Sequence, residues 1–309
     1  MALPFVAPGL PRPDELLAVP FEAVRHVRRG LALQVTNLLA GDHAPITEQR
    51  TSTFADDPGY FGPDSVTWRI HDDACVLVGG VRALMLQTMH PLAMAGVAQH
   101  SNYRDDPLER LANTTMYVGT TIYGSKDDVA RAIALVKRVH VRVQGTAPDG
   151  RHYDANDPHL LTFVHHTLVD SFLRAYQRYG SSPLSAADAD RYVAEQAVLA
   201  DLFEAEPAAR SVTELEAYFD AMRTEMRATA EARDTIRFLL APPLPLIARA
   251  PYAVLVAASI TMLPRWIRWQ LRLPVLPTVE PLIVRPAGLA LVRTLDWVLA
   301  AHPAAPPSV

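Results

Sequence analysis

The residue best placed to bind a cofactor in this sequence is a histidine within a series of apolar residues. Val129, Ile133, Val136 and His140 follow one another at intervals of four, three and four residues. This spacing puts their side chains on one face of an α-helix. Because the face is otherwise apolar, we expect His140 to point into the protein interior. A buried imidazole needs a hydrogen-bond partner at both ring nitrogens or a metal ion on one of them.

Two other predicted helices carry histidines in the same way. His90 and His100 share a helical face with Leu86, and His165 lies on an apolar stripe from which His166 is turned aside. Three helices that each direct a histidine inward indicate a bound cofactor or a polar network. The alternative for each is a core histidine bonded to a backbone carbonyl.

The motifs that would bind other cofactors are absent. The sequence has no Glu-x-x-His pair for a di-iron centre, no His-Glu-x-x-His zinc motif and no Cys-x-x-Cys-His for covalent haem. It also lacks a Gly-x-Gly-x-x-Gly phosphate loop and a Gly-x-Ser-x-Gly nucleophile elbow. The class that remains is non-covalent haem held by one histidine, for which helical bundles are suitable hosts.

The elements that must position these histidines are helices. Apolar residues recur at helical spacing through most of the chain, and the 26 prolines mostly fall between those stretches. We therefore expect an all-α fold, a single bundle of roughly ten helices. The predicted helices are Phe21–Leu39, Ser65–Leu77, Val81–His100 with a kink at Pro91, Pro107–Tyr123, Lys126–Gln144, Pro158–Tyr179, Ala186–Phe203, Val212–Ala228, Ala232–Leu240, Pro251–Gln270 and Ala287–Ala301.

Composition limits the class of protein. The 309 residues are half apolar and one fifth charged, with a net charge of −4 and no Lys/Arg run, so we expect no nucleic-acid partner. A single cysteine, Cys75, excludes an internal disulfide and a thiolate metal cluster. The first residues do not have the pattern of a secretory signal, and no apolar stretch is long enough to span a membrane. We expect a cytoplasmic protein.

Three parts follow from the same patterns. Residues 1–40 form an N-terminal arm and the first helix, residues 41–240 the main helical domain, and residues 241–309 C-terminal helices packed on the same bundle. The boundary lies at the proline-rich stretch Pro242–Pro245.

Between Gly79 and Ser171 the chain resembles the catalytic domain of the MpaB/rubber-oxygenase family, which includes the latex clearing proteins. The resemblance depends on the order and spacing of many short matches. They are Gly79–Gln87, His90-Pro91, Gly96-Val97, His100-Ser101, Asp106–Leu111, Thr114, Tyr123-Gly124, His140–Val143, Gly145, Asp149-Gly150, Tyr153, Ala155–Pro158 and Val164-His165.

This resemblance implies a globin-like helical fold, haem b and an oxygenase that acts on an apolar small molecule with dioxygen. The family's proximal iron ligand falls on His140, and its Arg-x-x-x-Thr pair near the haem falls on Arg110 and Thr114. Rubber oxygenases have a lysine just before that threonine, where this sequence has Asn113. An amide is a poor iron ligand, so the sixth position holds water, is open, or is filled by another histidine such as His90 or His100. This departure favours a substrate smaller than rubber.

The segment from Pro251 to Leu271 has two interpretations. Its apolar residues and its terminal Trp266-Ile267-Arg268-Trp269 are typical of a helix lying on a membrane surface. They are equally typical of a core helix whose Trp and Arg cover the edge of a bundle. We favour the core helix and keep peripheral membrane contact through residues 251–272 as the alternative.

The sequence thus predicts a haem-dependent oxygenase, an oxidoreductase, with iron on His140. Arg110 and Thr114 are the candidate catalytic residues, and His90, His100 and His165 are further candidates to contact the cofactor. Two alternatives remain: a haem-binding protein without turnover, for sensing or storage, and a helical structural module without a cofactor.

Overall fold

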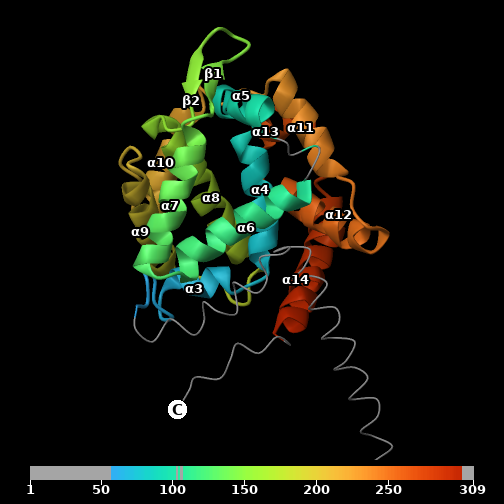
Figure 1. Ribbon diagram of the computed structural model, residues 1–309. Helices are drawn as coiled ribbons and strands as arrows, with labels where there is room; N and C mark the ends of the chain where they lie inside the picture. The colour runs from blue at the N-terminus through green and yellow to red at the C-terminus, as the bar shows by residue number, and fades with distance from the viewer. Residues whose placement is uncertain (1–56, 102–103, 105–106, 301–309) are drawn as a thin grey trace, which may run out of the picture.

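The protein is almost entirely helical. The structure, a computed structural model, describes residues 57–101, 104 and 107–300, with only the backbone for 107–111. Helices pack around one another in a single body, and the described strands form one small hairpin at its top edge (Figure 1). The prediction of an all-α fold is confirmed. The helix expected at Phe21–Leu39 and the arm before it lie outside the described residues.

Two helices pack closely at the centre of the body. They are α4 (Cys75–Gln87) and α8 (Pro158–Tyr179). Their closest approach is at Gly79, where a Cβ atom would lie 2.8 Å from Cδ1 of Phe172. Only a residue without a side chain allows the two backbones to come so near.

A buried ion pair joins the same two helices. Arg82 forms a 2.8 Å ion pair with Asp170 and donates a 2.8 Å hydrogen bond to the Ser171 hydroxyl. Asp170 also accepts a 2.6 Å hydrogen bond from Arg174. Burying charges costs several kcal/mol per ion unless they are paired and hydrogen-bonded. The charged atoms of Arg82 and Asp170 have these partners.

The helical structure is interrupted on both sides of α4. The expected helix Ser65–Leu77 is α3 (Val66–His71) followed by a short turn and the start of α4. The expected kink at Pro91 is a full break between α4 and α5 (Pro91–His100), whose axes differ by 102°. A residue before proline avoids the helical backbone conformation, and His90 accordingly has φ −90° and ψ 114°.

Several helices surround the central pair, each beginning or ending near the predicted residue. In Figure 1, α6 and α7 lie in front of α4 and α8, while α9 and α10 lie to the left and α11 to the right. Their bounds are α6 Pro107–Tyr123, α7 Lys126–His140, α9 Ala186–Phe203, α10 Val212–Met222 and α11 Ala230–Leu240.

The C-terminal helices pack on the same core. They are α12 (Leu246–Thr261), α13 (Arg265–Gln270), the π-helical turn η2 (Glu280–Val284) and α14 (Arg285–Leu299). The Ser259 hydroxyl of α12 donates a 2.8 Å hydrogen bond to the Val78 carbonyl of α4. Arg82 also donates to the Met262 carbonyl at 3.2 Å. Residues after the proline-rich stretch therefore share the core of the main bundle.

A β-hairpin stands where the sequence predicted the end of a helix. Helix α7 ends at His140, not Gln144, and strands β1 (Gln144–Thr146) and β2 (His152–Asp154) pair antiparallel. Gly150, with φ +88°, allows the tight turn between them. The hairpin returns the chain to the C-terminal end of α7, so residues 154–156 lie beside His140.

The described helices were compared with the length and hydropathy that a membrane span requires. None meets both requirements alone; α4 and α5 meet them only together, across their sharp bend.

Candidate functional site

Helix α7 holds His140 on a face that becomes more open toward the histidine. The helix begins with a capping box in which Ser125 and Asp128 bond to each other's backbone. Val129 and Ile133 are buried, as the apolar stripe predicts, whereas Val136 and His140 are only half-buried. The interior next to His140 is therefore less completely filled than the interior next to Val129.

The ring of His140 has a buried, unpaired nitrogen and lies beside Asn156, which has an unpaired acceptor. Its Nδ1 atom and the Oδ1 atom of Asn156 are both buried and without a hydrogen-bond partner among the described residues. Asn156 is fixed by a 3.3 Å hydrogen bond from its amide nitrogen to the Lys137 carbonyl, one turn before His140. Burial lowers the pKa of His140, although the Ala155 backbone, the Asp154 carboxylate and the Asn156 amide oppose this. His140 is therefore neutral at neutral pH.

The neutral ring offers one lone pair for a metal. A proton on Nδ1 would face the acceptors at residues 155 and 156, and Nε2 would then be free. Haem and zinc ligands are oriented in this way, by a hydrogen bond from the second ring nitrogen to a carbonyl or carboxylate.

Helix α4 presents an open face beside its packed one. A Cβ atom added to Gly80 would meet no atom within 4 Å, in contrast to the crowded Gly79 next to it. Leu84 and Gln87, which follow Gly80 at helical spacing, are also only half-buried. This face of a central helix is therefore not filled by side chains of the described residues.

Helix α8 has a similar open face that carries His165. Leu161, Val164, His165 and Leu168 are half-buried, although most of this helix is buried. Burial lowers the pKa of His165 to about 3. The described side chains therefore do not completely cover the His165 ring.

The neighbouring histidine does not lie as the sequence suggested. His166, expected to turn aside, is 1% exposed, and its Nε2 accepts a 3.0 Å hydrogen bond from the Ala209 amide. The ring also packs edge-on against Tyr218. His166 is a structural core histidine, whereas His165 remains a candidate to contact a cofactor.

The other predicted site residues have separate surroundings. The Nε2 atom of His100 lies 3.0 Å from the Tyr153 hydroxyl, at the exposed end of α5. His90 is buried and lies near His159 and Glu225. These contacts do not include His140 or His165. The role of His90 and His100 as haem contacts stays a prediction.

Helix α6 carries the three remaining candidates. The side chain of Arg110 lies outside the described residues, and Asn113 and Thr114 are exposed. Arg110 and Thr114 are four residues apart within one helix, so both can reach one site. Their role at the cofactor stays a prediction.

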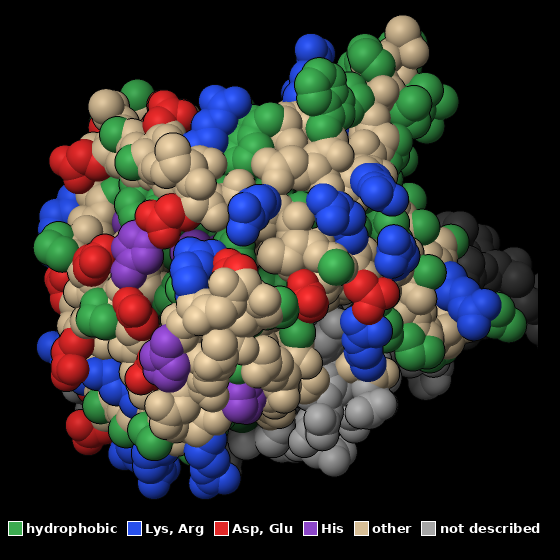
Figure 2. Space-filling view, turned by 90° about the horizontal axis from the view of Figure 1, so that it is seen from above, with side chains coloured by type: hydrophobic (Ala, Val, Ile, Leu, Met, Phe, Trp, Pro, Cys, Tyr) green, Lys and Arg blue, Asp and Glu red, His purple; other side chains and the backbone are tan. Residues whose placement is uncertain are grey.

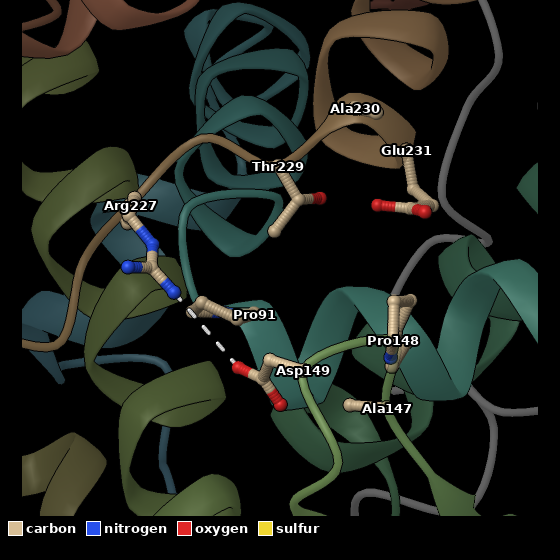
Figure 3. A pocket seen from close by; sticks show the side chains of 9 residues that line it. Pro91, Ala147, Pro148, Asp149, Arg227, Thr229, Ala230 and Glu231 are labelled. Carbon is tan, nitrogen blue, oxygen red and sulfur yellow. Dashed lines mark ion pairs between the residues drawn. The ribbon is translucent and has the colours of Figure 1, made fainter.

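A separate pocket opens between α5, the β-hairpin and the start of α11 (Figure 3). Its volume of about 290 Å³ is at the lower limit for ligand pockets. Figure 3 shows Arg227 and Asp149, 3.9 Å apart, on one side and Thr229 and Glu231 on the other. None of the predicted haem contacts lines it.

Sequence reasoning gave no role to several residues that the structure places at these sites. Asn156 belongs to a matched motif, but its position beside His140 depends on the hairpin, which the sequence did not reveal. Gly80 looked equivalent to Gly79, because a sequence cannot show which glycine faces a neighbouring helix. His159 and Glu225 are 66 residues apart in sequence, so only the fold brings them together.

Comparison with known proteins adds one finding to this geometry. No curated protein and no solved structure matches the chain. The family model described as "ER-bound oxygenase mpaB/B'/Rubber oxygenase, catalytic domain" matches residues 68–298, which include α4 to α13 and nearly all of α14. The chain therefore belongs to the oxygenase family of mpaB and rubber oxygenase catalytic domains.

Proposed function

We propose that the protein is a haem b-dependent oxygenase in which His140 is the axial iron ligand. The carrying observation is the neutral His140 ring, which has a buried, unpaired Nδ1 and lies beside Asn156, whose amide oxygen is also unpaired. If Nδ1 of His140 carries the ring proton, Nε2 is left as the ligand atom. The open faces of α4 and α8 support the proposal, since a porphyrin needs an apolar cleft between helices.

The chain's own groups would hold and orient the haem and the substrate, while the haem, when bound, supplies the redox chemistry toward dioxygen. Asn156 and the Ala155 carbonyl would fix the tautomer of His140. Leu84, Leu161 and Leu168 would cover the apolar ring or an apolar substrate. Arg110, with its planar fork of donors, suits a propionate or an oxygen species at the same site.

A second candidate function is haem binding without turnover. The observation that favours it is His165, a neutral histidine on an open interior face. If His165 were a second axial ligand, dioxygen could not reach the iron directly. Carbon monoxide binding to the reduced haem protein distinguishes the two functions, because an open or water-bound iron binds it rapidly and a bis-histidine iron slowly.

The internal space can be tested at Gly80. A Cβ atom at Gly80 meets no atom within 4 Å, so Leu at this position would extend from an open point of the helix and the Gly80→Leu protein should fold. Its haem affinity should fall at least tenfold relative to the Gly80→Ala control in a haem titration followed by absorption. Equal affinities of the two variants would place haem elsewhere.

We also propose that the C-terminal helices contact a membrane surface. Val256, Ala258 and Ile260 of α12 and Ile267 of α13 are buried, which supports the core interpretation of residues 251–271, whereas the other apolar residues of these two helices are half-buried or exposed. Exposed apolar side chains nevertheless occur within and beside this segment. We call this set the C-terminal apolar surface: Leu246, Ile247, Trp269, Leu282 and Ile283, each 62–79% exposed.

The charges around this surface suit anionic lipid. Residues 241–300 contain six arginines and two acidic residues, although the whole chain has a net charge of −4. One of the two acids, Glu280, is already paired with the buried Arg268. In Figure 2, Lys and Arg gather with apolar side chains toward the C-terminal helices on the right, and acidic side chains gather on the left. Basic and apolar side chains together are typical of interfacial binding.

Vesicle sedimentation tests this contact. The full chain should bind vesicles of phosphatidylserine and phosphatidylcholine more tightly than vesicles of phosphatidylcholine alone. Changing Leu282 and Ile283 to Asp should reduce binding at least fivefold. In the matched control, Leu135 and Val139, exposed apolar residues of α7, are changed to Asp instead. This variant should bind vesicles as the unchanged protein does. Equal loss in both variants, or no binding at all, would contradict the contact.

A further inference from the structure

A second site of convergent metal-binding groups lies apart from His140. One ligand atom from each of His90, His159 and Glu225 lies within 4.8 Å of the other two. They come from the start of α5, the start of α8 and the segment between α10 and α11. We propose that these three side chains bind a divalent transition metal ion of borderline softness, with zinc as the representative ion.

Two separations, both to the Glu225 carboxylate, are close to those of a metal site. His90 Nε2 is 3.5 Å and His159 Nε2 is 3.2 Å from Glu225 Oε2. A tetrahedral ion bound at about 2.0–2.1 Å places its ligand atoms about 3.3–3.4 Å apart. A hydrogen bond between a charged nitrogen and a carboxylate is shorter, about 2.7–2.9 Å. The 3.5 Å separation at His90 thus fits shared coordination of an ion better than a direct hydrogen bond.

The most buried member of the set is the one that lacks a partner. His90 is 1% exposed, and its Nε2 has no hydrogen-bond partner among the described residues. Its ring packs against the buried Phe163, with 5.0 Å between ring centroids, which holds Nε2 toward the other two ligands. Its Nδ1 is 3.5 Å from the Ala93 amide, the outer limit of a hydrogen bond. The buried Nε2 thus has no hydrogen-bond partner, and a metal would bind its lone pair once the ring proton moves to Nδ1 and the long contact with the Ala93 amide is given up.

His159 has the outer partner that metal-binding histidines commonly have. Its Nδ1 lies 3.1 Å from Oε2 of Glu206 and its Nε2 lies 3.2 Å from Oε2 of Glu225. With the proton on Nδ1, an ion bound between Nε2 and Glu225 would replace the second hydrogen bond. Glu206 is itself held near the start of α8, because its amide donates to the Pro158 carbonyl and its carbonyl accepts from Thr162. The arrangement of carboxylate, histidine and ion is thus complete except for the ion.

The three segments are also joined by backbone contact. The Arg227 amide donates a 2.7 Å hydrogen bond to the Met89 carbonyl, which keeps Glu225 near His90. Glu225 and His159 are partly exposed, 42% and 34% at the side chain, so a fourth position faces solvent. Two imidazoles and one carboxylate suit zinc or ferrous iron, whereas calcium and magnesium prefer all-oxygen sets. Three protein ligands and a water are typical of catalytic zinc sites.

Zinc titration of the full-length protein tests the site independently of haem. After treatment with a chelator and dialysis, the protein should bind one zinc ion per chain in competition with a chromogenic chelator. The Glu225→Gln and His159→Ala variants should bind at least a hundredfold more weakly. Glu206→Gln, which changes only the outer partner, should weaken binding about tenfold to a hundredfold.

Two control variants change a histidine and a glutamate that lie outside the proposed metal site. His152 is an exposed histidine of β2, and Glu231 lies in the pocket of Figure 3. His152→Ala and Glu231→Gln should bind zinc as the unchanged protein does. Zinc should also raise the melting temperature of the unchanged protein and of both controls, but not that of Glu225→Gln.

Glu225 is exposed, so its variant should fold even if changes at the buried His90 prevent folding. The absence of stoichiometric zinc binding would overturn the proposal and leave a proton-bonded network of the two histidines with Glu225 and Glu206. Equal affinity in Glu225→Gln and the controls would overturn it as well.

Discussion

At the scale of single residues, the proposed iron site is set by the groups around His140. Burial keeps this histidine neutral, and the hairpin places Asn156 beside its ring. Asn156 would therefore act on the proposed iron through the orientation of His140. Asn113, where the family's rubber oxygenases have lysine, would offer that iron no amine.

Replacing Asn156 by Ala should lower haem affinity by about 10–100-fold, because loss of a partner to an axial histidine has effects of this size. The protein should keep its helical content, since the Asn156 side chain donates one described hydrogen bond, to the Lys137 carbonyl, and the hydrogen bond from its backbone amide to Asp154 does not depend on the side chain. A haem titration and a circular dichroism spectrum measure the two quantities. Affinity equal to that of the unchanged protein would mean that Asn156 does not orient His140.

At the scale of elements, neighbouring glycines of α4 have opposite functions. Gly79 allows contact with α8, and Gly80 faces open space. Gly79→Ala should therefore destabilise the protein by about 1–3 kcal/mol through overpacking. Gly80→Ala should be neutral or stabilise it by up to about 1 kcal/mol, because Ala favours helices. Urea unfolding of both variants checks this, and equal destabilisation would mean that Gly80 also lies at a packed interface.

The sequence predicted elements best where local capping determines the ends. Helices α6, α8 and α9 begin and end at the predicted residues, and a proline or a capping serine marks each start. Prediction failed where tertiary contacts decide, as at the break before α4 and in the hairpin after His140. The inward stripe on α7 was predictable from its period. The pairing of His140 with Asn156 was not, because it depends on how the hairpin folds back.

At the scale of the whole molecule, buried neutral histidines should make the haem-free protein sensitive to acid. Burial lowers the pKa of His71 and His165 to about 3 and that of His166 to about 4, from 6.5 in the unfolded chain. The unfolded state therefore binds more protons than the folded state below pH 6.5. Stability should be fully present above pH 6.5 and should decline as the pH falls toward about 3.

Urea unfolding at several pH values between 7 and 4 measures this decline. His166→Gln keeps an acceptor for the Ala209 amide but removes one titrating group, so stability should decline less steeply with falling pH. An unchanged slope in that variant would show that His166 does not take up a proton on unfolding in this range.

The absorption spectrum of the purified protein supplied with haem tests most directly whether His140 binds the haem iron. The unchanged protein should show a Soret band and bind one haem per chain. His140→Gly should lose most of the haem and regain it when imidazole is added as a replacement ligand, while His152→Ala, a change at an exposed histidine of β2, should retain it. A folded protein that binds no haem, or a His140→Gly variant with full haem occupancy and an unchanged spectrum, would contradict the assignment of His140 as the iron ligand.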